Sequence, residues 1–336
     1  MAQARATAAR AQPPVLPLWA VTALFWSAVL AVVLARAAGV ADNAEIGTFG
    51  VIFTSIVVEA LPFILIGAIA SAAIAAFVPA RAFARLGALP TPVQVPAAAL
   101  AGLAMPVCEC GSVPVARRLM LRGVQPSAGI AFMLAAPILN PIVLASTWVA
   151  YGAAGRAAEM TIARAVLGLI VAVTAGLVIG RGGEPLVRTG GSTPQEHDHE
   201  HDHGAGGAFA EHLAADFLFM GRFLVLGAAV AALLQTAVPQ DWLSSVADLT
   251  VISALALMGM AVALSLCSEA DAFVAVSFTA FPLGSQLAFL VIGPVFDAKL
   301  AVLYGATFQR GFALRLLAIA APVALAGALI FDAVVG

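Results

Sequence analysis

Apolar stretches long enough to cross a bilayer recur along most of this chain, and they constrain its fold more than any other feature. They lie at 16–34, 48–78, 127–151, 161–180, 209–238, 286–304 and 312–335. A hydrocarbon core about 30 Å thick is crossed by about 20 apolar residues in a helix. Only 10% of the residues are charged, against about 25% in soluble domains. We therefore expect an all-α polytopic membrane protein with about eight transmembrane segments.

A polar segment divides the chain. Residues 181–208 are rich in glycine, charge and histidine, which is typical of a flexible linker. We expect the following organisation: an N-terminal tail and extra helix (1–47), a first repeat (48–180), a cytoplasmic linker (181–208) and a second repeat (209–336). The triplet at 35–37 resembles a signal-peptidase site. The apolar run before it is long for a signal peptide, so we favour an uncleaved helix.

The two halves share short motifs in the same order. The segment at 61–79 aligns with 220–239, and AFMLAAPILNP (131–141) aligns with AFLVIGPVFDA (288–298). The alignment pairs Gly67 with Gly227, Cys108 with Cys267, and Asn140 with Asp297. Internal repeats are typical of secondary transporters, whose substrate site lies at the repeat interface near the bilayer midplane.

The distribution of arginine and lysine favours inverted repeats. These residues prefer the cytoplasmic side of a membrane. The segments 93–121 and 250–283 either cross the membrane once or dip into it and return. If both return, the arginine residues in the loops lie much more on one side of the membrane than if both cross once. Each half then has an odd number of full crossings and one re-entrant hairpin, which inverts one half relative to the other. The alternative, that 270–281 belongs to a longer crossing, stays open.

A cysteine motif, MPVCECGSVP, ends the apolar run at 93–107. Pro106, Gly111 and Pro114 argue against a continuous helix through 106–114. Cys108 and Cys110 are therefore expected on a break, which at membrane depth must be buried in protein or line a cavity. Buried free cysteines are also common in protein cores, and a redox pair of these two cysteines is a further interpretation.

The corresponding break in the second half carries Cys267, Ser268, Glu269 and Asp271. If the two breaks meet, a single cavity holds all three cysteines together with Glu109, Glu269 and Asp271. Thiolates select soft ions and metalloids, and carboxylates can carry protons. This combination suits a proton-coupled exporter of a thiophilic solute.

Asn140 and Asp297 occupy matching positions in two proline-interrupted helices. Interrupted helices at corresponding places in two halves indicate a binding site, so both residues are candidates for substrate binding. Lys299 lies beside Asp297 in the sequence and is a candidate for an ion pair. The competing interpretation is a simple kink filled by a neighbouring helix.

Glu59 lies well inside its apolar span, and Arg222 falls close to the equivalent depth in the second half. An ionisable residue inside a membrane span is a functional candidate by default. We expect Glu59 either to pair with Arg222 or to carry protons. Asp216 is an alternative partner for Arg222.

The linker contains HDHEHDH at 197–203. Its histidines are His197, His199, His201 and His203. Alternating imidazole and carboxylate groups bind divalent metals loosely, and the competing interpretation is a solvated charged tether. No other cofactor is expected, and no basic stretch suggests a nucleic-acid partner.

Two motifs resemble a known family. CECGSVPVARRLMLRGVQPSAGIAFMLAAPILNP and CSEADAFVAVSF are similar to the signatures of the ArsP/UPF0718 (DUF318) family of predicted permeases. The resemblance implies a multi-pass permease of the bacterial inner membrane. Characterised members include efflux permeases for trivalent organoarsenicals such as methylarsenite, which implies that Cys108, Cys110 and Cys267 are candidate arsenic ligands.

The hypotheses are therefore three. The first is a secondary permease, not an enzyme, that exports a thiophilic metalloid compound with proton coupling. The second is a zinc, nickel or copper transporter, favoured by the histidine linker. The third is a membrane thiol–disulfide oxidoreductase. Lipid and a small metalloid or metal substrate are the expected partners, and a homo-oligomer is left open.

Overall fold

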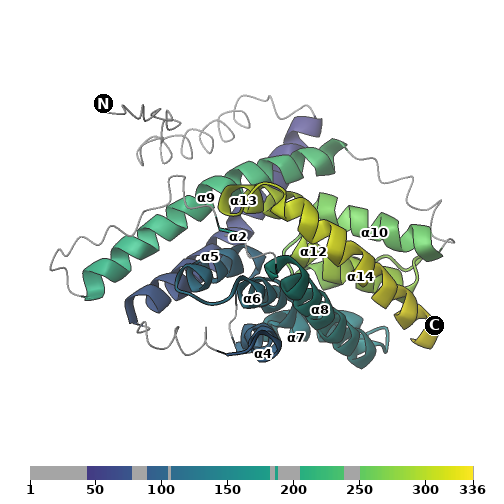
Figure 1. The fold of residues 1–336 in the computed structure, drawn as a ribbon. Helices are drawn as coiled ribbons and strands as arrows, with labels where there is room; N and C mark the ends of the chain where they lie inside the picture. Colours follow the sequence, from purple (N-terminus) through teal and green to yellow (C-terminus); the bar gives the residue numbers. More distant parts are fainter. Residues whose placement is uncertain are drawn as a thin grey trace, which may run out of the picture.

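The computed structural model describes residues 44–77, 89–104, 107–181, 186–187, 205–237 and 250–335, and these residues are almost entirely helical (Figure 1). This confirms the all-α class. The predicted first helix at 16–34 and the histidine tract at 197–203 lie outside the described residues, so both stay predictions.

The helices of the first half match the apolar stretches of the sequence. They are α2 (Ala44–Phe77), α4 (Thr91–Ala101), α5 (Glu109–Leu121), α6 (Pro126–Leu139), α7 (Pro141–Gly152) and α8 (Ala157–Gly180). Those of the second half are α9 (Ala205–Ala237), α10 (Thr250–Leu264), α11 (Asp271–Ala275), α12 (Leu283–Val295), α13 (Ala298–Thr307) and α14 (Phe312–Val335).

Six helical stretches in the described part of the chain are long and apolar enough to cross a membrane. They are Ile46–Ala73, Pro126–Gly152, Ala157–Gly180, Leu213–Thr236, Leu283–Thr307 and Phe312–Val335. Each coincides with an expected span. The helices α4 and α10 are shorter, with 11 and 15 residues, so the described residues contain fewer crossings than the predicted total of about eight.

Two of the six stretches are interrupted where the sequence predicted a break. The Asn140 backbone separates α6 from α7, and an extended Asp297 precedes α13. Both side chains cap the helix that follows: Asn140 Oδ1 accepts from the Ile142 amide at 2.9 Å, and Asp297 Oδ1 from the Leu300 amide at 2.6 Å. Such caps satisfy amide groups that a helix start leaves without partners.

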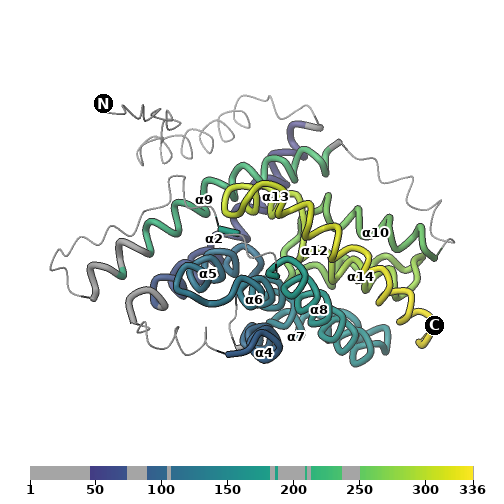
Figure 2. Tube along the Cα trace, viewed as in Figure 1, coloured from purple at the N-terminus to yellow at the C-terminus, as the bar shows by residue number. Residues whose placement is uncertain are grey.

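The long helices α2 and α9 lie side by side, and the remaining helices form a second group beside them (Figures 1 and 2). In that group α6 packs between α4 and α8, α12 packs between α10 and α14, and α8 contacts α14. Contacts of α2 with α5 and of α9 with α13 join the pair to the group. The two halves therefore use the same order of packing, α4–α6–α8 and α10–α12–α14.

Two glycines bring the α2–α9 pair close to the second group. A Cβ added at Gly67 would lie 2.5 Å from the Gly111 Cα atom, and one added at Gly227 would lie 2.7 Å from the Lys299 Cα atom. Small residues at such crossings allow helix backbones to approach closely. The two glycines that the sequence alignment pairs thus lie next to α5 and α13, the helices that carry site residues.

The cysteine motif differs from its prediction in one respect. The helix α5 begins at Glu109, after the non-helical Val107 and Cys108, so no helix runs continuously through 106–114, as expected. Cys110 lies inside α5, so the prediction that it lies on the break is wrong. Pro114 is the sixth residue of α5 and lacks the amide hydrogen that would bond to the Cys110 carbonyl. Gly111 packs closely against Gly67 of α2 in this part of the chain.

Candidate functional site

Four helix ends from the two halves meet at the candidate site. They are the start of α5 at Glu109, the end of α10 at Leu264, the start of α11 at Asp271 and the start of α13 at Ala298. Glu109, Asp297 and Lys299 are nearly inaccessible, with 2%, 0% and 5% of their surface exposed. Ionisable side chains this deeply buried are stable only when paired.

Lys299 lies at the centre of this meeting point. Its Nζ atom is 2.8 Å from Glu109 Oε1 and 3.4 Å from Asp297 Oδ2. The same ammonium donates to the backbone carbonyls of Ser265 at 3.1 Å and Leu266 at 3.3 Å. The expected Asp297–Lys299 contact is therefore present, and Glu109 joins it from the other half of the chain.

All three cysteines border this charged centre, and all three are reduced and buried. Cys108 and Cys110 flank Glu109 in the sequence, and Cys267 follows the Ser265 and Leu266 carbonyls that bind Lys299. The Cys267 thiol donates to Glu269 Oε2. Within the described residues, no group of three or more His, Cys, Asp or Glu side chains has the geometry to hold a metal ion.

Cys108 and Cys267 have the same backbone role. The Cys108 carbonyl accepts from the amides of Gly111 and Ser112, at 3.1 and 3.0 Å. The Cys267 carbonyl accepts from those of Ala270 and Asp271, both at 3.0 Å. Each cysteine thus immediately precedes a helical turn at a break.

A second buried ion pair lies next to the first. Arg164 donates to both carboxylate oxygens of Asp271, at 2.8 and 2.6 Å, and to Thr147 Oγ1 at 2.8 Å. Ser268 links the two pairs, because its hydroxyl donates to Glu109 Oε2 at 3.0 Å while its carbonyl accepts from Arg164 at 3.3 Å. The two buried ion pairs are therefore connected by a single residue.

Arg164 was not identified as a candidate from the sequence, yet it is fully buried inside α8. A usable signal was present, because Arg164 lies inside the predicted span at 161–180, and an ionisable residue inside a membrane span is a functional candidate.

Asn140 and Glu59 relate differently to this centre. Asn140 is fully buried and caps α7, and its amide Nδ2 has no hydrogen-bond partner. Glu59 is exposed on the surface of α2, so the buried centre does not enclose it.

Arg222 and Asp216 lie on α9. The guanidinium carbon of Arg222 is 4.6 Å from the centroid of the Phe219 ring and 4.8 Å from that of Phe223. Asp216 accepts from Arg118 at 2.9 Å and from Ser71 at 2.7 Å. The Asp216 carboxylate thus ties α9 to both α5 and α2.

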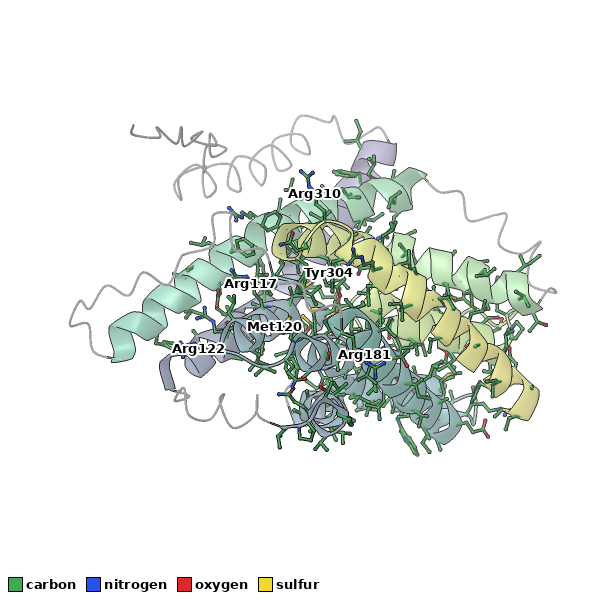
Figure 3. All side chains as sticks on the ribbon, in the orientation of Figure 1. Arg117, Met120, Arg122, Arg181, Tyr304 and Arg310 are labelled. Atoms are coloured by element: carbon green, nitrogen blue, oxygen red, sulfur yellow. The ribbon has the colours of Figure 1, made fainter. Side chains whose placement is uncertain are left out.

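A cavity of about 520 Å³ opens away from the charged centre, where α4 and α6 begin and α8 ends. Its lining residues are Thr91, Pro92, Gln125, Pro126, Ser127, Leu177, Gly180 and Arg181. Figure 3 labels Arg181, which directly follows α8, and Tyr304 of α13. The cysteines and Lys299 are nearly inaccessible, so the site is closed in this conformation.

The six candidate spans, the paired helix breaks and the buried charged centre together define a multi-pass membrane protein of the transporter class. Residues 45–333 match the model of the ArsP_1 family, described as a predicted permease, and the chain belongs to this family. It is a permease rather than an enzyme.

Two curated bacterial relatives agree with this membership. The UPF0718 protein YcgR of Bacillus subtilis is 40% identical over 283 residues, which cover 83% of this chain and 95% of the relative. A putative two-component membrane permease complex subunit of Streptococcus mutans is 35% identical over 268 residues, covering 79% of this chain and 88% of the relative. No solved structure matches significantly.

Proposed function

We propose that this permease exports a thiophilic metalloid compound, such as a trivalent organoarsenical, across the bacterial inner membrane by a proton-coupled secondary mechanism. The observation that carries the proposal is that the three cysteines adjoin the Lys299–Glu109 pair: Cys108 and Cys110 flank Glu109, and Cys267 follows the two carbonyls that bind Lys299. Soft sulfur ligands select soft metalloids. A buried centre reached from both halves suits a substrate site at a repeat interface.

The proposal includes two inverted repeats, each with a re-entrant segment. Its support is the equal packing order of the two halves and the matching roles of Cys108 with Cys267 and of Asn140 with Asp297. In such transporters one repeat rocks against the other around a fixed site. The close α2–α5 and α9–α13 crossings are the contacts that this rocking would change.

Binding is a ligand exchange. When a cysteine thiol displaces a hydroxyl group from a trivalent arsenical, an As–S bond forms, an As–O bond breaks and one water molecule leaves, with no change in oxidation state. The Cys267 thiol already donates to Glu269, so this carboxylate is placed to relay the thiol proton to the hydroxyl group that leaves as water. We assign proton handling to Glu59, Glu109, Glu269 and Asp271.

A growth assay tests the substrate class. A metalloid-sensitive bacterial host expressing the chain is challenged with methylarsenite, arsenite, antimonite, Zn²⁺, Ni²⁺ and Cu²⁺. Protection against trivalent arsenicals that is lost in Cys108→Ser, Cys110→Ser and Cys267→Ser supports the proposal. Serine is close to cysteine in size, so the variants should fold. The amount of each variant in the membrane is measured as the control, so that loss of protection is not caused by loss of protein.

The same assay separates the alternatives. Protection only against a divalent metal, lost on deletion of 197–203 and unchanged by the serine variants, would establish the metal transporter instead. A Cys108–Cys110 or Cys108–Cys267 disulfide that cycles during turnover would support the oxidoreductase. Proton coupling is measured in everted membrane vesicles, where collapse of the pH gradient should abolish uptake of the substrate.

We also propose that the chain works with a second membrane subunit, because the Streptococcus mutans relative is described as a subunit of a two-component permease complex. Affinity purification from the native membrane in mild detergent should recover one other protein in fixed ratio. Recovery of this chain alone, as a monomer or homo-oligomer, would contradict the proposal.

A further inference from the structure

The ammonium group of Lys299 fills a cage of four oxygen atoms. The cage consists of Glu109 Oε1 at 2.8 Å, Asp297 Oδ2 at 3.4 Å and the carbonyls of Ser265 at 3.1 Å and Leu266 at 3.3 Å. We call it the Lys299 cage. Its four oxygen atoms belong to α5, to the break after α10 and to the start of α13. Two carboxylates and two carbonyls are hard oxygen ligands, which suit hard cations rather than soft ones.

The backbone of the break directs the carbonyls into the cage. Ser265 has a φ of 47°, in the left-handed region that side-chain-bearing residues rarely adopt. Its hydroxyl accepts from the Ala298 amide at 3.1 Å, which ties the break to α13. The cage also lies just beyond the end of α10, where the helix dipole favours positive charge.

One cage atom is incompletely used. Asp297 is fully buried, and its Oδ2 atom has no hydrogen-bond partner beyond the 3.4 Å ionic contact with Lys299. The lysine therefore sits closer to Glu109 than to Asp297. Because this contact is long, the buried Asp297 Oδ2 atom is able to bind a cation that lies nearer to it.

The cage cannot stand empty in the membrane. Without the lysine, Glu109 and Asp297 would be two unpaired carboxylates at a site that is almost fully buried. Uncompensated charge at such a site is strongly unfavourable. A conformation in which Lys299 turns away therefore requires a compensating positive charge, either protons on the two carboxylates or a cation in the place of the ammonium group.

We propose that the Lys299 cage is a cation site of the transport cycle, occupied by the lysine ammonium in this conformation and by a small monovalent inorganic cation when the lysine leaves. The role of this site in a transport cycle rests on the proposed function, whereas the binding of a cation by the cage does not. The cage contains no sulfur, so it is a separate site from the thiols. Lys299 is a tethered competitor for the cation.

The test measures thermal unfolding of the purified full chain in detergent, by tryptophan fluorescence, in choline chloride against lithium, sodium or potassium chloride at equal ionic strength. Lys299→Gln removes the tethered cation and keeps a polar side chain. Its unfolding temperature should fall by roughly 5 °C or more in choline chloride. At least one alkali cation should restore most of this loss with a saturable dose dependence, while the wild type changes little.

Two variants serve as controls. Arg164→Gln also removes one buried cation but leaves a single carboxylate, Asp271, so alkali cations should restore little of its loss. The double variant Glu109→Gln/Lys299→Gln removes one cage carboxylate and should lose the cation response. An equal response of Lys299→Gln in choline and in all alkali chlorides would overturn the proposal.

Poor folding of the single variant is also informative. If Lys299→Gln is recovered folded only when extracted in an alkali chloride, the cage binds that cation and the proposal is supported. If it fails in every salt while the double variant folds in all of them, no cation enters the cage and the proposal is wrong. Because no substrate is added, failure here leaves the arsenical assay unaffected, and the reverse also holds.

Discussion

Removal of Arg164 should destabilise the fold more than removal of any surface cation. Arg164 and Asp271 form a two-bond ion pair at 2.8 and 2.6 Å, with side-chain exposures of 0% and 4%. Arg164→Met keeps most of the packing volume but leaves the Asp271 carboxylate buried without its partner. Breaking a buried pair in this way costs about 3–5 kcal/mol, which corresponds to a fall of roughly 5–15 °C in unfolding temperature.

The chain provides a matched control for this prediction. Arg156 pairs with Glu159 at 2.7 Å at the start of the same helix, but their side chains are 40% and 45% exposed. Exposed pairs contribute about 0–1 kcal/mol. Arg156→Met should therefore shift the unfolding temperature by only about 1–3 °C, although its contact is equally short.

The assay is thermal unfolding of purified variants in detergent, followed by tryptophan fluorescence. The double variant Arg164→Met/Asp271→Leu removes both charges and should regain more than half of the stability lost by Arg164→Met, because no uncompensated charge remains. Losses for Arg164→Met no larger than for Arg156→Met would refute the reasoning. So would a double variant whose loss equals the sum of the two single losses.

Two further predictions concern the contacts of α9. Gly227→Ala should lower the unfolding temperature by several degrees, since its new methyl group would lie 2.7 Å from the Lys299 Cα atom and overpacking typically costs about 1–3 kcal/mol. Gly221→Ala in the same helix meets nothing within 4 Å and should be neutral or slightly stabilising. Arg118→Gln should lower the free energy of unfolding by about 1–3 kcal/mol, because the variant loses the contact with Asp216. An unfolding temperature equal to that of the wild type would contradict this prediction.

The cysteine motif shows how far local sequence reasoning reaches. The thiols and the prolines identified a candidate site and two interrupted helices, and the breaks at Asn140 and Asp297 are where the prolines predicted them. Pro114, however, lies inside α5. A proline disfavours a helix locally but does not by itself determine where the helix begins or ends, and α5 extends through this position.

Sequence by itself determined the membrane class, the positions of the spans and the residue types available for chemistry. These properties depend on hydropathy and turn preference over short windows, which can be read from neighbouring residues. Tertiary structure alone decided that Glu109 pairs with Lys299 and that Arg164 pairs with Asp271. Every buried charge needs a partner, but which partner it finds depends on which helix ends meet, and that is set by the packing of the whole fold.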